Sequence, residues 1–102
     1  MDSDYSTLRQ AIQERLVVTC DYDNRSRELY PLLLGKKDGE RKFFGWQFGG
    51  RKTKGTLAPG GEWKCFFVSK MRNVSTRKEE WEKTYFPGTG EQTCMDEIDV
   101  RH

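Results

Sequence analysis

Two segments of the sequence have the pattern of half-buried β-strands, and each of them carries at least one cation. Residues 27–34 read Arg-Glu-Leu-Tyr-Pro-Leu-Leu-Leu, and residues 64–71 read Lys-Cys-Phe-Phe-Val-Ser-Lys-Met. Apolar residues that alternate or cluster in this way are typical of strands. A cation on such a strand must reach a face or an edge, or find an anionic partner, because burial of an isolated charge is costly. Together the two segments predict a site for an anion.

The rest of the chain predicts one helix and further short strands. An amphipathic helix is expected over residues 6–15, because apolar residues recur there with helical period: Leu8, Ala11, Ile12 and Leu16. Strands are expected at 17–22, 27–34, 42–48 and 63–68, with a fifth through 72–76. The fold class is therefore mainly β (α+β), and five short strands favour a small, bent barrel, since closure removes exposed edges.

Local signals refine this expectation. Pro31 cannot donate a ladder hydrogen bond, so the strand 27–34 should lie at an edge or carry a bulge. The Asp38-Gly39 pair predicts a tight hairpin. Alternation along residues 42–48 sets two groups on opposite faces: Phe44, Trp46 and Phe48 on one, and Phe43, Gly45 and Gln47 on the other.

The net charge of +2 hides a segregation along the chain. Residues 36–78 hold twelve basic and three acidic residues, a local charge of +9, whereas residues 1–35 amount to −2 and residues 79–102 to −5. Such asymmetry indicates an anionic partner for the middle segment, with an acidic tail that competes for it. A solvated basic face balanced by the tail is the alternative interpretation.

Enzymatic and metal chemistry find little support in the residue types. The only histidine is His102, and no catalytic or phosphate-loop motif is present, so we expect a non-enzymatic protein without cofactors. Cys20, Cys65 and Cys94 are an odd set without close spacing, which indicates neither a disulfide framework nor a zinc site. Buried, inert thiols are expected at Cys20 and Cys65.

The order of these motifs resembles that of a WYL domain. Tyr22 is followed by Arg27-x-Leu29-x-Pro31-x-x-Leu34, then by a glycine hairpin, an aromatic strand and Lys64-x-Phe66-x-Val68-x-Lys70-Met71. The similarity covers residues 6–78. The Trp-Tyr-Leu triplet that names the family is replaced by Lys42-Phe43-Phe44-Gly45-Trp46. Lys64 and Lys70 stand where the family usually has arginine, and lysine lacks arginine's bidentate grip on phosphate.

The resemblance implies an Sm-like, SH3-like barrel that acts as a sensor in bacterial transcription regulators or phage-defence proteins. Domains of this family are thought to bind nucleic acid or nucleotide-like ligands through basic residues. We therefore expect this chain to bind single-stranded nucleic acid or a nucleotide and to regulate an effector. The alternative is a protein-interaction or oligomerisation module that docks to a partner regulator or forms a homodimer, without a nucleic-acid ligand.

The candidate ligand-binding residues fall into three groups. Cations are expected on the barrel and in the glycine-rich loop 49–61: Arg27, Lys64 and Lys70, and Arg51, Lys52 and Lys54. Stacking surfaces for bases are expected at Tyr30, Phe43 and Trp63. Core packing of the aromatic residues, a flexible loop crossing, and ion pairs of Arg27 or Lys70 with Asp21 or Glu28 are the structural alternatives.

We expect one domain over residues 1–86 and an acidic C-terminal tail over 87–102. Residues 79–86 are ambiguous between a helical turn and a sixth strand. The tail is expected to be mobile, to pack back through Met95, Ile98 and Val100, or to occupy the basic surface as an autoinhibitor. No apolar run is long enough for a membrane span and no signal peptide is expected, so a cytoplasmic location is predicted.

Overall fold

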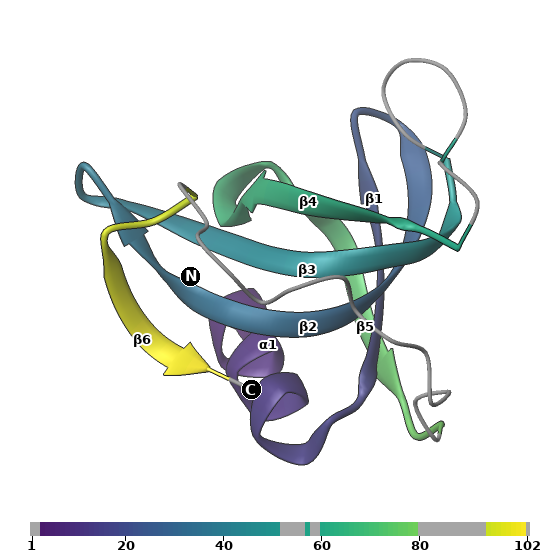
Figure 1. Ribbon diagram of the computed structural model, residues 1–102, viewed down its shortest axis with the longest axis horizontal. Helices are drawn as coiled ribbons and strands as arrows, with labels where there is room; N and C mark the ends of the chain where they lie inside the picture. The colour runs from purple at the N-terminus through teal and green to yellow at the C-terminus, as the bar shows by residue number, and fades with distance from the viewer. Residues whose placement is uncertain (1–2, 52–56, 58–59, 80–93, 102) are drawn as a thin grey trace.

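The computed structural model describes residues 3–51, 57, 60–79 and 94–101. One helix, α1 (Ser3–Glu14), precedes the strands β1 (Val17–Tyr22), β2 (Arg25–Lys37), β3 (Glu40–Gly50) and β4 (Glu62–Phe67). A short 3-10 helix (Val68–Lys70) leads to β5 (Arg72–Arg77), and β6 (Glu97–Arg101) follows near the C-terminus. The protein is thus mainly β with one helix, as the sequence predicts (Figure 1).

All strands belong to one antiparallel sheet in the order β4-β3-β2-β1-β5, and β6 pairs with β2. The long strands β2 and β3 curve across the molecule, and α1 lies against one side of the sheet next to β6 (Figure 1). Within the described part of the chain no ladder joins β4 to β5, so the sheet is open between these two strands. The hairpin prediction is confirmed, because Asp38 and Gly39 both have positive φ, 52° and 80°, between β2 and β3.

The inner core lies between α1 and the concave side of the sheet. The predicted helical stripe is buried there and contacts apolar side chains of β1 to β4: Leu8, Ala11, Ile12, Leu16, Val18, Leu29, Phe43 and Phe66. Met71 and Val100 also belong to this cluster. Burial of such aliphatic and aromatic side chains is the main source of stability.

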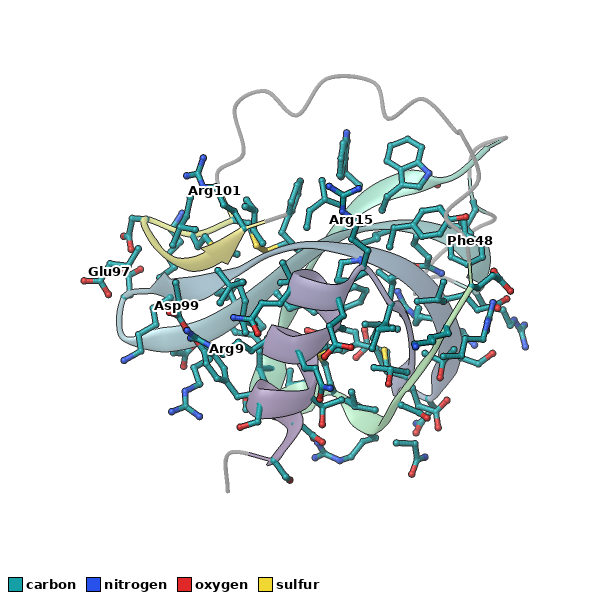
Figure 2. The ribbon with its side chains drawn as sticks, turned by 90° about the horizontal axis from the view of Figure 1, so that it is seen from below. Arg9, Arg15, Phe48, Glu97, Asp99 and Arg101 are labelled. Atoms are coloured by element: carbon teal, nitrogen blue, oxygen red, sulfur yellow. A yellow bond between two sulfur atoms is a disulfide. The ribbon has the colours of Figure 1, made fainter. Side chains whose placement is uncertain are left out.

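A second cluster lies on the other face of the sheet, and we call it the outer aromatic cluster. Its buried members are Val17, Tyr30, Leu32 and Trp46, with Leu33, Phe44, Phe48 and Trp63 packed against them. The predicted division of β3 into two faces is confirmed, since Phe44, Trp46 and Phe48 belong to this cluster and Phe43 to the inner core. Figure 2 shows Phe48 at the end of the molecule opposite to the β6 residues Asp99 and Arg101.

Strand β2 is central in the sheet, and the register of its pairing with β3 shifts between Pro31 and Leu33. The bulge alternative for Pro31 is therefore the one that the structure adopts. Because a bulge changes the side-chain alternation, Leu32 lies in the outer aromatic cluster whereas Leu34 lies in the inner core.

The C-terminal residues 94–101 lie on the body of the domain. Met95 and Val100 are buried and Ile98 is exposed, while the backbone N–H of Asp96 donates to the carbonyl of Lys36. Asp99 accepts hydrogen bonds from Tyr5 (2.5 Å) and Arg9 (2.7 Å) of α1, and Figure 2 shows Arg9 and Asp99 turned toward one another. The ambiguous segment 79–86 lies outside the described residues except for Glu79.

The prediction for Cys65 is wrong, because Cys65 and Cys94 form a disulfide. Cys65 is exposed, whereas Cys20 is a buried free thiol as expected. Burial raises the pKa of Cys20 to about 12. In the described part of the chain, no helix is long and apolar enough to cross a membrane.

Candidate anion-binding groove

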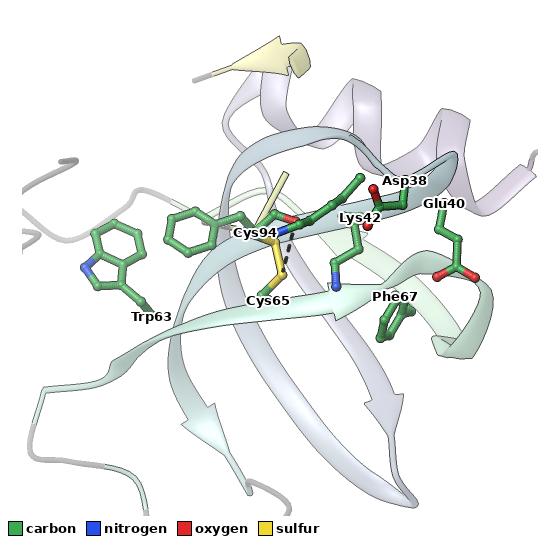
Figure 3. Close-up of a pocket in the computed structure, with 9 residues that line it drawn as sticks. Asp38, Glu40, Lys42, Trp63, Cys65, Phe67 and Cys94 are labelled. Carbon is green, nitrogen blue, oxygen red and sulfur yellow. Dashed lines mark hydrogen bonds between the residues drawn. A yellow bond between two sulfur atoms is a disulfide. The ribbon is translucent and has the colours of Figure 1, made fainter. Parts of the chain in front are cut away.

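A groove of about 520 Å³ crosses the outer side of β3 and β4, and we call it the Lys42 groove (Figure 3). Its walls come from the β2–β3 hairpin, from β3, from β4 and from the disulfide: Lys37, Asp38, Glu40, Lys42, Phe44, Trp63, Cys65, Phe67 and Cys94. The register of the two strands explains this set, because Lys42 pairs with Phe67 and Phe44 pairs with Cys65. Alternate residues of paired strands share one face.

One half of the groove is aromatic. The rings of Phe44 and Trp63 are stacked with centroids 5.0 Å apart, and Trp63 meets Trp46 edge to face at 4.9 Å. The Trp46 indole N–H donates to the carbonyl of Gly60 at 3.0 Å, which fixes the ring beneath Trp63. The aromatic half is therefore an ordered stacking surface that is continuous with the outer aromatic cluster.

The other half of the groove carries charges of both signs, from the ammonium groups of Lys37 and Lys42 and the carboxylates of Asp38 and Glu40. The Lys42 Nζ atom lies 3.6 Å from the centroid of the Phe67 ring, and the Lys70 Nζ atom lies 5.0 Å from the same centroid. Partial burial lowers the pKa of Lys42, and the charges of Lys37 and Lys70 lower it further, whereas Glu40 raises it. Among the charges around Lys42, the carboxylate of Glu40 has the largest effect, so an anion that binds Lys42 competes with Glu40 and relieves the repulsion from Lys37 and Lys70.

The structure places Arg27 in the inner core and away from this groove. The residue is 3 % exposed, and its guanidinium lies 5.5 Å from the Tyr22 ring and 5.6 Å from the Phe66 ring. Its Nη2 atom donates to the carbonyl of Tyr22 at 3.0 Å. Burial lowers the pKa of Arg27, because its guanidinium is shielded from water and contacts the two aromatic rings instead. This placement favours a structural role.

The other predicted cations are dispersed. Lys64 alternates with the groove residues Trp63 and Cys65, and its ammonium pairs with Glu62 at 3.4 Å. Arg51 is exposed and follows β3, and its backbone N–H donates to the carbonyl of Ser26. Lys52 and Lys54 lie outside the described residues. Lys70 lies near the groove residue Phe67, but it lines a neighbouring hollow with Asp21, Asp23, Asn24, Arg72 and Asn73. Among the described residues, therefore, none of the predicted cations lines the groove itself.

The predicted stacking residues separate in the same way. Phe43 is fully buried in the inner core, so its prediction as an accessible surface is wrong. Tyr30 is 4 % exposed and stacks on Phe48 with centroids 4.4 Å apart. Trp63 is half-buried and lines the groove, so its role as a stacking surface stays a prediction.

Sequence reasoning missed Lys37, Lys42, Phe44 and Phe67 as members of the site. Antiparallel pairing of residues 42–48 with 63–68, read with an alternation of two, would have placed residues 42 and 44 beside 67 and 65. The structural alternative is an ion pair of Arg27 or Lys70 with Asp21 or Glu28. In the structure Glu28 pairs with Arg77 at 2.9 Å, and Asp21 accepts a hydrogen bond from Asn73 at 2.7 Å.

Comparisons with known proteins give no further guide. Neither a family model, nor a curated protein, nor a solved structure matches this chain. Within the described ranges, no group of three or more His, Cys, Asp or Glu residues is placed to hold a metal ion. The geometry of the Lys42 groove therefore carries the functional argument.

Proposed function

We propose that this protein is a binding module for an anionic ligand, single-stranded nucleic acid or a nucleotide, and that the ligand binds in the Lys42 groove. The observation that carries the proposal is the arrangement of Lys42 and Lys70 around the Phe67 ring, next to the stacked rings of Phe44 and Trp63. Positive charge beside an aromatic surface is the combination that binds single strands and nucleotides.

The two halves of the groove suit the two parts of such a ligand. Phosphate oxygens accept hydrogen bonds from the lysine ammonium groups, which act as point charges and impose no planar geometry. A base stacks on Trp63 or Phe44 and gains about 1–3 kcal/mol from that contact. The carboxylates of Asp38 and Glu40 at the hairpin end bind donors such as ribose hydroxyls or amino groups of the base.

The fold and the sequence motifs support a more specific form of this proposal. A strand order of β4-β3-β2-β1-β5, with a 3-10 turn before β5, suits an Sm-like or SH3-like bent barrel. With the motifs that resemble a WYL domain, it supports a cytoplasmic sensor that regulates a transcriptional or phage-defence effector. In this proposal Lys42 and Trp63 contact the ligand, a role that the sequence motif assigned to Arg27.

A protein-binding surface is the second candidate function. Leu33, Phe44 and Phe48 are only partly buried on the outer face of the sheet, where they adjoin the Lys42 groove. An apolar face of this kind binds a partner protein through area burial, which depends little on salt. The two functions thus predict different responses to ionic strength.

Binding of fluorescein-labelled oligothymidylate and oligouridylate, measured by anisotropy at low and physiological salt, tests the proposal. The Lys42→Ala/Lys70→Ala double variant should weaken binding at least about tenfold, since each lost phosphate contact costs affinity. Arg15→Ala/Arg25→Ala serves as the control, because it removes the same charge from residues that neither line the groove nor lie over the Phe67 ring. Equal losses in both variants, or no binding at physiological salt, would overturn the proposal and favour the protein-binding function.

A further inference from the structure

The two cysteines of the disulfide differ in accessibility, and both of them line the Lys42 groove. Cys65 is exposed on β4, whereas Cys94 is 7 % exposed and lies behind it (Figure 3). Their Cα atoms are 5.8 Å apart, although 29 positions separate them in the sequence. A sulfur that a solvent-borne thiolate can approach is the requirement for thiol–disulfide exchange.

The remaining cysteine does not take part in this chemistry. Cys20 is 3 % exposed in the inner core, and its raised pKa keeps the thiol protonated at neutral pH. Because the thiolate is the reactive form, Cys20 is inert in the folded protein. The chain therefore has one accessible redox pair, and it lies in the wall of the candidate binding site.

We propose that the Cys65–Cys94 disulfide is a thiol–disulfide exchange site for a dithiol reductant, and that its reduction weakens ligand binding in the Lys42 groove. The second part of this inference rests on the proposed function of the groove. Lys37 and Lys42 line the same groove together with Asp38 and Glu40, so an approaching thiolate meets charges of both signs. The exposure of Cys65 is what gives the reductant access to the disulfide.

The exchange proceeds in two balanced steps. A thiolate of the reductant attacks Cys65 Sγ, the Cys65–Cys94 bond breaks, and Cys94 leaves as a thiolate that takes up a proton. The second thiol of the reductant loses its proton and attacks its own sulfur in the mixed disulfide, which releases Cys65 as the second thiolate. Two electrons pass from the dithiol, which becomes a cyclic disulfide, to the protein, which gains two thiols.

The anchoring of Cys94 explains why reduction should change the groove and leave the sheet intact. On its C-terminal side, Cys94 is followed by the buried Met95, by the Asp96 hydrogen bond to Lys36, and by the ladder of β6 with β2. The disulfide is the covalent link that holds Cys94 against β4. After reduction, this wall of the groove loses its fixed position, and a less preorganised site binds its ligand more weakly.

The experiment compares oligothymidylate binding by the air-oxidised full chain before and after treatment with dithiothreitol, with iodoacetamide alkylation counted by mass spectrometry. We expect no alkylated cysteine in the oxidised native protein and two after reduction. We expect affinity to fall at least about fivefold on reduction, a change of about 1 kcal/mol. Cys65→Ser/Cys94→Ser should bind with the weaker affinity and ignore dithiothreitol, whereas Cys20→Ser should keep the full response.

Three results would each contradict a different part of the proposal. Resistance of the native disulfide to dithiothreitol would overturn the exchange site. If two cysteines are alkylated after reduction but the affinity is unchanged, reduction does not regulate ligand binding in the groove. The proposed function would then still stand. Absence of oligonucleotide binding by the oxidised protein would overturn the proposed function and the regulation that rests on it, while the alkylation count would still decide the exchange chemistry.

Discussion

The ammonium group of Lys42 lies 3.6 Å from the centroid of the Phe67 ring, its partner across the β3–β4 ladder. Lys70 approaches the same ring from the 3-10 helix at 5.0 Å. A cation held over an aromatic face gains about 0.5–2 kcal/mol, depending on its exposure to water. Phe67 therefore gathers two positive charges from different elements at one place, and the ligand need not organise them.

Anion affinity should depend on pH through Lys42. Because its pKa lies below that of an ordinary lysine, Lys42 loses its proton first as the pH rises, and affinity falls with that loss. In Lys42→Arg the charge persists throughout this range, so the decline should shift to higher pH. Oligothymidylate binding measured from neutral to alkaline pH checks this, and superimposable profiles of the two proteins would contradict it.

Arg27 should matter for stability and not for ligand contact. Arg27→Ala removes a side chain packed between Tyr22 and Phe66, and we expect a loss of about 2–4 kcal/mol in the free energy of unfolding. Arg27→Met fills much of the space and needs no charge desolvation, so it should retain most of the stability. Urea denaturation gives the free energy of unfolding of both variants.

The control for this series is Arg77→Ala. Arg77 forms ion pairs with Glu28 and Glu79, and its side chain is 40 % exposed, so its removal should cost only about 0–1 kcal/mol. Arg27→Met should also bind oligothymidylate as the unaltered protein does. A folded Arg27→Met protein with much weaker binding would show that Arg27 contacts the ligand after all.

Gly35 should be required for the docking of β6 on β2. A Cβ atom at this position would overlap the carbonyl oxygen of Glu97 and lie 2.9 Å from the Met95 sulfur. We expect Gly35→Ala to lower the free energy of unfolding by about 3 kcal/mol and to speed amide exchange in residues 97–101. Gly39→Ala is the matched control, because it meets no atom within 4 Å and costs about 1–2 kcal/mol through its positive φ. Equal effects of the two substitutions would be evidence against this packing.

Removal of the disulfide should lower stability through the unfolded chain. A cross-link between residues 29 positions apart restricts the unfolded ensemble and contributes about 3.5 kcal/mol in the chain-entropy model. Cys65→Ser/Cys94→Ser should therefore unfold at lower urea concentration than the oxidised protein. Cys20→Ala removes only one buried sulfur and should cost about 1 kcal/mol. A double variant as stable as the oxidised protein would show that the cross-link contributes little.

Local signals in the sequence predict most of the elements correctly. The stripe of Leu8, Ala11 and Ile12 marks the helix face that is buried, and the Asp38-Gly39 pair marks the hairpin. The helix stripe and the hairpin both depend on residues that are close in the sequence, within one helical turn or one β-turn. Such local patterns can be recognised in a single sequence.

The candidate site is less predictable because it depends on pairing between distant segments. Arg27 and Lys42 both stand on strands with alternating patterns, but only the register shows that Arg27 points into the inner core and Lys42 into the groove. The Cys65–Cys94 pair has no sequence signature, since its 29-residue separation reflects the path of the whole chain. The strand β6 is likewise not predicted, because the acidic residues next to Ile98 and Val100 make this segment resemble a polar tail.

The contacts of Asp99 with Tyr5 and Arg9 join positions 94 and 90 residues apart, so the first helix and the last strand of the fold stabilise one another. During synthesis α1 emerges from the ribosome long before its partner exists. The final packing of the domain must therefore wait until residue 101 has left the exit tunnel. Contacts of such large sequence separation slow folding, and until β6 arrives the unpaired edge of β2 at Leu33–Lys36 remains open to pairing with other nascent chains.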